Sequence, residues 1–201
     1  MKFEAFYGSI LPEVIGCPDP MVNARITAAA AEFCREALVW NEVQDPFTLV
    51  DGVFEYDLDV PAGAFIVTVM DVWSNDRLLS PTSTKLPFGA SLEPSHFRVS
   101  EFNTLRVFPT PSAPTASLKV HVAYAPLMTA TSLPDSLVRF VDAIASGAKA
   151  DLMLMPAVPW SNPNLATYYR QKFLTSIADC RISEMHSRVN SSLTVAPRLF
   201  T

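Results

Sequence analysis

The chain contains few of the residues on which recognisable catalytic or nucleotide-binding motifs depend. Six glycines in 201 residues leave no GxGxxG or GxxxxGK loop that would hold a phosphate. The three cysteines, Cys17, Cys34 and Cys180, form no CxxC pair and are too few for a disulfide framework, which favours a reducing compartment. No GxSxG or HExxH motif occurs, and His96, His121 and His186 lie in no local motif. These absences predict that the protein is not an enzyme and has no bound cofactor or metal.

Charged residues are also scarce, and acidic residues outnumber basic ones, which does not suit a surface that binds nucleic acid. Charged residues make up 17% of the chain, the formal net charge is −5, and no run of Lys and Arg occurs. Nucleic-acid-binding proteins need clustered basic side chains. No apolar run reaches the ~20 residues of a membrane-spanning helix, and Pro12 interrupts the apolar part of the N-terminus, so we expect neither membrane insertion nor a signal peptide. A low charged fraction suggests surface that neighbouring proteins cover.

Helical periodicity occurs near both ends of the chain. Asp19 followed by Pro20 suits a helix start, and apolar residues then recur at steps of three and four. The same spacing returns after Pro126 and includes Gly147, which indicates close packing against a partner helix, because glycine otherwise weakens a helix. The predicted helices span about 20–41, 134–155 and 162–188, and residues 1–18 are predicted to be extended and loop-like.

Between these helices the period of apolar residues changes to two, which is typical of strands. Asp51 and Gly52 separate two apolar runs and suit a tight hairpin turn. Strands are predicted at 47–50, 53–60, 65–73, 77–79, 96–100, 104–108 and 117–124. Short strands with frequent turns indicate an antiparallel sandwich or barrel.

The predicted fold class is therefore α+β. A three-helix bundle carries an antiparallel β-sandwich or barrel module inserted between its first and second helices, and an extended tail follows the third. The helical domain comprises residues 1–45 and 128–189, the β module residues 46–127, and the C-terminal tail residues 190–201.

Two features of the β module and the helix junction leave other functions open. Glu55, Asp57 and Asp59 are predicted to project from one strand face about 7 Å apart, a spacing that suits a small hydrolase or a metal site. A solvated strand face explains them better, because polar side chains normally alternate outward on a sheet. Trp73, Trp160, Tyr168 and Tyr169 would suit a carbohydrate-binding module, although core or interface packing is the favoured interpretation.

The last dozen residues are too apolar for a purely solvating tail, yet they show no helical repeat. A docking arm that adds as a strand to a neighbouring subunit, or fills a pocket on it, explains this composition. A frayed terminus is also compatible with it. The predicted interaction residues are Leu193, Val195, Arg198, Leu199 and Phe200.

Two stretches contain the prolines, glycines and polar residues that mark helix boundaries, and they lie near the two ends of the chain. They are called here the two stretches of helix punctuation. The first comprises Leu11-Pro12-Glu13-Val14, Gly16-Cys17-Pro18-Asp19-Pro20, Glu32-Phe33-Cys34 and Val39-Trp40; the second comprises Gly147-Ala148, Leu152-Met153, Pro156, Pro159-Trp160, Asn162-Pro163, Tyr168-Tyr169 and Phe173. With the order of elements, they resemble the head-to-tail connector (adaptor) proteins of tailed bacteriophages, similar in architecture to the tail tubular protein A type. The β module matches only in general character.

The resemblance implies a structural virion protein of the phage neck, placed between the capsid portal and the tail after assembly in the host cytoplasm. It implies a homo-oligomeric ring of twelve copies beneath the portal protein, with the β module toward tail or nozzle proteins. DNA would pass through during ejection without being read, which suits a modestly acidic protein. The adaptor role involves no catalytic, cofactor-binding or metal residues. A carbohydrate-binding or other ligand-binding module of a phage tail is the alternative, and the small hydrolase is less favoured.

Overall fold

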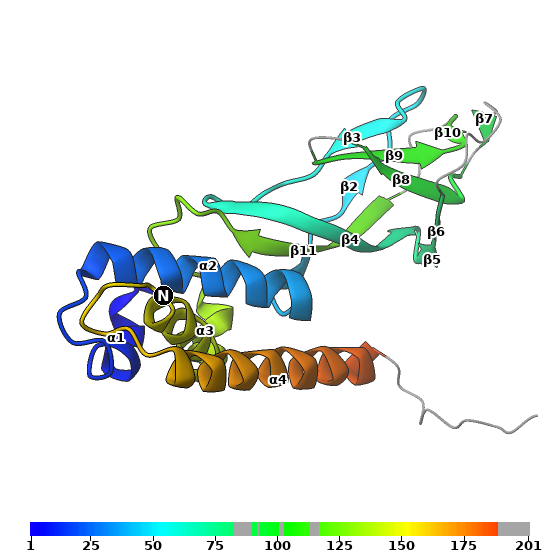
Figure 1. Cartoon of the computed structure of the whole chain (residues 1–201). Coiled ribbons are helices and arrows are strands. Elements are labelled where there is room, and N and C mark those ends of the chain that lie inside the picture. The colour runs from blue at the N-terminus through cyan, green and yellow to red at the C-terminus, as the bar shows by residue number, and fades with distance from the viewer. Residues whose placement is uncertain (83–89, 92, 101–102, 113–116, 189–201) are drawn as a thin grey trace, which may run out of the picture.

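The computed structural model describes residues 1–82, 90–91, 93–100, 103–112 and 117–188. Within them the fold is mixed α+β, with four α-helices gathered in one part and short strands in the other (Figure 1). The helices are α1 (Glu4–Ile10), α2 (Asp19–Ala37), α3 (Val141–Met153) and α4 (Pro163–Arg188), and the 3₁₀ helix η2 (Asp135–Phe140) leads into α3.

Helix α1 corrects the expectation of a loop at residues 1–18. Phe6 and Ile10 are fully buried and lie four positions apart, so they share one face of the short helix. The chain then turns, and Val14 joins the same core before α2 begins. The N-terminal segment is thus part of the helical core.

Helix α2 ends four residues earlier than its apolar period predicts. Leu38 adopts a left-handed conformation with φ of 54°, and its N–H donates to the Cys34 carbonyl at 3.0 Å. Such a conformation stops a helix. Trp40 therefore lies directly before β1, where its carbonyl accepts from the Tyr124 N–H at 2.8 Å and its ring centroid lies 5.6 Å from that of Tyr124.

The predicted close approach at Gly147 is confirmed. A Cβ on Gly147 would lie 3.0 Å from the Ala29 Cβ and 3.0 Å from ring carbons of Phe173. Helices α2, α3 and α4 therefore meet at this residue. The Phe173 ring in turn packs 5.9 Å from the Phe33 ring, measured between centroids. The regular α-helix around Gly147 is shorter than the predicted 134–155, because η2 precedes it and α3 ends at Met153.

The strands form two larger sheets and one small pair. The strands are β1 (Asn41–Val43), β2 (Phe47–Thr48), β3 (Glu55–Asp57), β4 (Ala64–Ser74), β5 (Arg77–Leu78), β6 (Ser80–Pro81), β7 (Ala90–Ser91), β8 (His96–Ser100), β9 (Thr104–Phe108), β10 (Thr110–Pro111) and β11 (Ser117–Pro126). One sheet has the order β1-β11-β4-β5, with β2 also paired to β11, and the other has the order β3-β9-β8-β6. Every pair in the first sheet is antiparallel, as predicted, whereas β6–β8 in the second sheet and the separate pair β7–β10 are parallel.

The predicted hairpin around Asp51 and Gly52 is wrong in its pairing. The turn exists, because the Val53 N–H donates to the Val50 carbonyl at 3.1 Å and Gly52 has a φ of 74°. However, β2 pairs with β11 and β3 pairs with β9, so the turn joins two different sheets. Local turn chemistry predicted the bend correctly, whereas distant strands determine the pairing.

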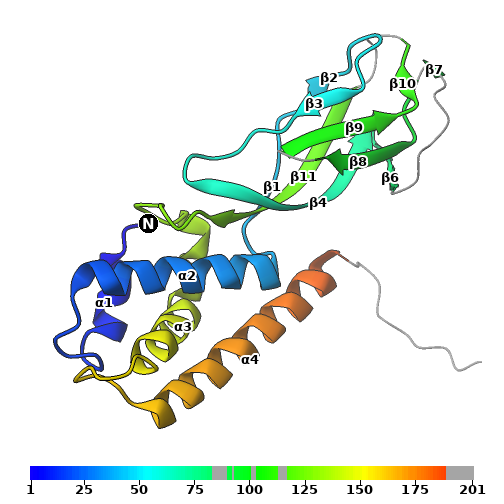
Figure 2. The same cartoon turned by 45° about the horizontal axis from the view of Figure 1, so that its top comes forward.

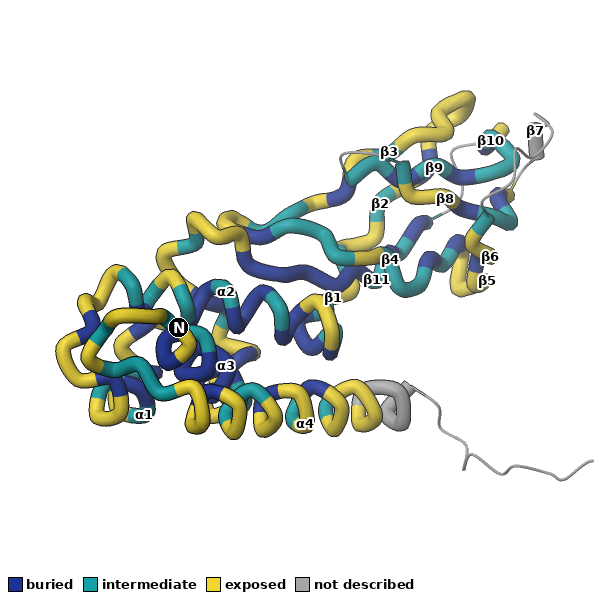
Figure 3. The backbone as a smooth tube through the Cα atoms, in the orientation of Figure 1, coloured by how far each residue is buried: buried dark blue, intermediate teal, exposed yellow. Residues whose placement is uncertain are grey.

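The two larger sheets lie one over the other, and the helices pack beneath the β11 side (Figures 1 and 2). Helix α2 contacts β11 directly. Buried residues follow α2, α3 and β11 as one continuous cluster that extends into both sheets (Figure 3). The β elements and the helices therefore share a core, and the outer strand edges and the outer side of α4 are left exposed.

Candidate interaction surfaces

The predicted interaction residues of the C-terminus, Leu193, Val195, Arg198, Leu199 and Phe200, lie outside the described residues. Surfaces for partners are therefore sought among the side chains that the structure does place. Two stand out: an apolar face on α4 and an acidic side of the β module.

A shallow, mostly apolar groove lies between the end of α3 and the first turns of α4. It has a volume of about 370 Å³, and its lining includes Leu154, Arg170 and Leu174. Leu154 and Leu174 are 56% and 48% exposed. Ala178 and Ile182 continue the exposed face along α4 at steps of four residues, so they lie in one line with Leu174. Figure 3 shows this outer side of α4 largely exposed. A contiguous apolar stripe of this kind is typical of a protein–protein contact.

An ion pair fixes the rotation of α4 and hence the direction of that stripe. The two guanidinium nitrogens of Arg170 donate to both carboxylate oxygens of Glu32 on α2, at 2.9 and 2.5 Å. This two-point geometry is more specific than a single contact. On α3, burial raises the pKa of Asp151, while Arg25 and Arg170 act in the opposite direction.

A second polar cluster joins the two stretches of helix punctuation. Glu13 accepts from Lys149 Nζ on α3 at 2.9 Å and from the Tyr169 hydroxyl on α4 at 2.5 Å. The Lys149 ammonium also lies 3.9 Å from the centroid of the Tyr169 ring. Burial acts to raise the pKa of Glu13, but hydrogen bonds from Tyr169 and Lys149 outweigh it and leave that pKa lowered. The hydrogen bond to Glu13 raises the pKa of Tyr169 to about 12.

The acidic side of the β module comes from an unusual stretch of sequence. Residues 41–76 contain no Lys or Arg, and their acidic residues are Glu42, Asp45, Asp51, Glu55, Asp57, Asp59, Asp71 and Asp76. The first six of these are exposed. Glu55 is neutralised by Arg106, and the other exposed carboxylates favour partners with basic groups.

Of the three carboxylates predicted to share one strand face, Glu55 and Asp57 lie in β3 and are already engaged, whereas Asp59 lies beyond the end of that strand. Glu55 and Asp57 are exposed on either side of partly buried Tyr56. Glu55 pairs with Arg106, and Asp57 accepts from the Thr104 hydroxyl at 3.2 Å. Within the described ranges, no group of three or more His, Cys, Asp or Glu residues is placed to hold a metal. The solvated strand face is the better interpretation of these residues.

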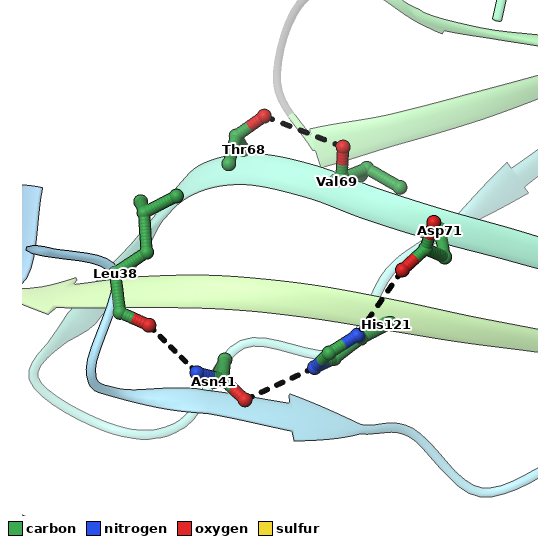
Figure 4. A network of polar contacts seen from close by, with 6 residues as sticks. All are labelled: Leu38, Asn41, Thr68, Val69, Asp71 and His121. Atoms are coloured by element: carbon green, nitrogen blue, oxygen red, sulfur yellow. Dashed lines mark hydrogen bonds and ion pairs between the residues drawn. The ribbon is translucent and has the colours of Figure 1, made fainter. Parts of the chain in front are cut away.

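A polar network links β1 to β11 beside it and to β4 on the far side of β11 (Figure 4). Asn41 donates to the Leu38 carbonyl at 2.6 Å, and its Oδ1 lies 3.0 Å from Nε2 of His121 on β11. The other ring nitrogen of His121 lies 3.6 Å from a carboxylate oxygen of Asp71 on β4. Trp73 stacks on the His121 ring with 6.3 Å between centroids, so this aromatic residue has a packing role. The network holds β1 at the edge of its sheet.

Apolar side chains are also exposed at the turn between β2 and β3. Val50, Val53 and Phe54 are among the exposed large hydrophobic residues. The Tyr56 hydroxyl holds this turn, because it accepts from the Val50 N–H at 3.0 Å and donates to the Val53 carbonyl at 2.9 Å. Figure 1 shows the turn at the end of the β part that lies away from the helices.

The remaining aromatic residues named for carbohydrate binding contact other side chains, although Tyr168 is itself 59% exposed. Trp160 is partly buried against the core, and Tyr168 contacts Tyr169 edge to face with 5.2 Å between centroids. No helix in the described part of the chain is long and apolar enough to cross a membrane.

The comparison with known families matches nearly the whole chain. The family model described as SU10 adaptor protein matches residues 10–196. This span includes both stretches of helix punctuation, the β elements between them and most of the C-terminal tail. A search of curated proteins finds no match.

Proposed function

The chain belongs to the SU10 adaptor protein family and is a structural adaptor of a phage virion, and we propose that it joins the portal vertex to the tail. In this proposal it forms a neck ring of twelve copies that contacts the portal protein on one side and tail or nozzle proteins on the other. The ring encloses a conduit through which DNA passes during ejection without sequence-specific binding. The family match over residues 10–196 is the observation that carries the proposal.

The exposed apolar stripe on α4 supports contact with neighbours. Leu174 and Ile182 are 48% and 54% exposed, so covering the exposed half of each side chain would contribute roughly 0.8–1.5 kcal/mol, half of the value for full burial. A ring needs two different surfaces on every subunit, because each copy meets its neighbours head to tail. We assign the α4 stripe to one of these surfaces.

The division of the chain into domains is also part of this proposal. Residues 1–45 and 128–189 would form the helical base, a three-helix bundle of the tail tubular protein A type, which α1 extends. Residues 46–127 would form an inserted sandwich or barrel, and residues 190–201 a docking arm. In that arm Leu193, Val195, Arg198, Leu199 and Phe200 would contact a neighbouring subunit.

Native mass spectrometry of the protein mixed with the portal ring of the same genome tests the proposal. We expect capture near one copy per portal subunit. A Leu174→Glu variant should reduce ring formation, whereas Leu78→Glu places the same charge on an equally exposed leucine of β5 and should not. A protein that stays folded and separate from the portal would contradict the portal contact.

The arm is tested separately by a chain that ends at Arg198 and so lacks Leu199 and Phe200. We expect weaker ring formation at an unchanged melting temperature. Ring formation equal to that of the full chain would remove these two residues from the arm.

A further inference from the structure

We propose that the outer edge of β1 receives the C-terminal segment, residues 189–201, of a neighbouring copy, which adds to the sheet as a further strand. The inference rests on the proposed function, because the neighbour in the ring supplies the segment.

The main chain of β1 presents unpaired groups on its outer side. The Trp40 carbonyl accepts from the Tyr124 N–H at 2.8 Å, and the Gln44 N–H donates to the Val120 carbonyl at 2.9 Å. Main-chain groups alternate in direction along a strand, so those of Asn41 and Val43 point away from β11. Figure 4 shows β1 beside β11, with β4 on the far side. In the part of the chain that the structure describes, no strand pairs with this outer side.

The edge carries charges that oppose pairing with a second copy of itself. Glu42 and Asp45 are exposed, and Pro46 follows. Like charges placed opposite each other destabilise a strand pair, and charged residues and proline are common protections of edge strands. Glu42 accepts a hydrogen bond from the Trp40 indole at 3.2 Å, but neither Glu42 nor Asp45 has a basic ion-pair partner among the described residues. A partner strand without acidic side chains would add no further repulsion at this edge.

The C-terminal segment has the composition that such an edge accepts. Residues 189–201 contain Arg198 and no Asp or Glu, and Arg188 precedes them. Leu193, Thr194 and Val195 favour extended structure, and Pro197 ends the run. Fully extended, the segment spans about 40 Å. Main-chain hydrogen bonds would provide affinity, and alternate side chains would set the register.

The other strand edges fit this partner less well. On β3, Glu55 already pairs with Arg106 of β9, so that edge has less unneutralised charge. On β4, register shifts opposite residues 121–124 of β11 make the strand irregular, and such bulges disrupt regular pairing. The outer edge of β1 combines regular pairing with free acidic charge.

A labelled peptide of residues 189–201, added to the full chain and followed by fluorescence anisotropy, tests the proposal. We expect saturable binding that weakens as salt is raised. Val43→Pro removes the outward N–H without removing a β1–β11 hydrogen bond, and should weaken binding about tenfold. Val43→Thr keeps the N–H and should bind as the parent does. Equal binding by Val43→Pro and Val43→Thr, both folded by circular dichroism, would overturn the assignment.

Amide hydrogen exchange provides a readout that does not depend on a substitution. The Val43 N–H should exchange quickly in the free protein and become protected when the peptide is bound. Protection at another strand edge, or no saturable binding at all, would overturn the proposal. Capture on the portal ring is a separate measurement, so a failure at β1 is distinguishable from a failure of the adaptor function.

Discussion

Replacing Gly147 with alanine should destabilise the protein, although alanine is the better helix former. In a helix interior, alanine in place of glycine contributes about 1 kcal/mol to stability. Here the added Cβ would lie 3.0 Å from the Ala29 Cβ on one side and 3.0 Å from the Phe173 ring on another. Ordinary contacts between such carbon atoms lie near 3.5–4.0 Å. Two neighbours would therefore have to retreat together.

Neither neighbour has room to retreat. Ala29 is 2% exposed on α2, so its Cβ moves only if the helix moves. Phe173 is fully buried, and the Phe33 ring lies beside it. Overpacking a core typically costs about 1–3 kcal/mol, and contact from two sides places this site in the upper half of that range. After the helix-propensity gain is subtracted, we expect a net loss of about 1–2 kcal/mol.

Urea unfolding of Gly147→Ala measures this loss, with Gly8→Ala as the matched control. A Cβ on Gly8 in α1 meets nothing within 4 Å, so that variant should be stabilised by up to about 1 kcal/mol. Phe173→Leu should cost less in the Gly147→Ala background than in the parent, because the two changes share one space. If Gly147→Ala were stabilised as much as Gly8→Ala, the packing argument would be refuted.

Three further predictions concern polar and buried groups. Glu32→Gln and Arg170→Met should each cost about 1 kcal/mol and show coupling in a double-mutant cycle that decreases in high salt. The folded-state pKa of Glu13 is lowered, so its contribution is present above about pH 5 and lost as pH falls; the stability difference between Glu13→Gln and the parent should shrink in acid unfolding curves, and a constant difference would contradict this. Burial raises the pKa of Cys34 to about 12, so a thiol reagent at pH 8 should label it only as fast as the protein unfolds.

The elements with a strong local signal were predictable from the sequence. The strands predicted at 96–100 and 104–108 coincide with β8 and β9, because period-two alternation and intervening turn residues agree there. The start of α2 and the close approach at Gly147 were also correct. For the strands and the helix start, the residues that specify the structure lie within a few positions of one another. For Gly147, the missing side chain itself indicates that another helix packs closely there.

The errors arose where the deciding contact is distant or the local signal is atypical. Helix α1 is seven residues long and contains Gly8, so its apolar pair Phe6 and Ile10 gave little periodicity. The end of α2 depends on a left-handed leucine, whereas glycine is the usual residue there. The separation of β2 from β3 depends on β11 and β9, which follow much later in the chain.

The polar clusters of the candidate surfaces could not be predicted from the sequence either, because their residues are far apart along the chain. Glu13 and Tyr169 were singled out only as parts of two helix-punctuation stretches, and their contact joins residues separated by 156 positions. Lys149 offered one available signal, because it lies among the apolar residues of α3 and buried lysines need a partner. The acidic stretch 41–76 was visible in the sequence, but the position of Glu42 on an edge strand was not.

The placement of these features separates the residues that stabilise the fold from those that would bind a neighbour. Gly147 acts at the meeting point of α2, α3 and α4, whereas the proposed acceptor edge lies on β1 and is held there by Asn41 and His121. Substitutions at distant sites without shared partners act nearly independently. Gly147→Ala should therefore bind the 189–201 peptide with the parent's affinity at temperatures well below its midpoint, although its midpoint is lower. If Gly147→Ala lost peptide affinity as well as stability, the helical core and the β1 edge would be coupled. The edge would then belong to the same cooperative unit as the helices.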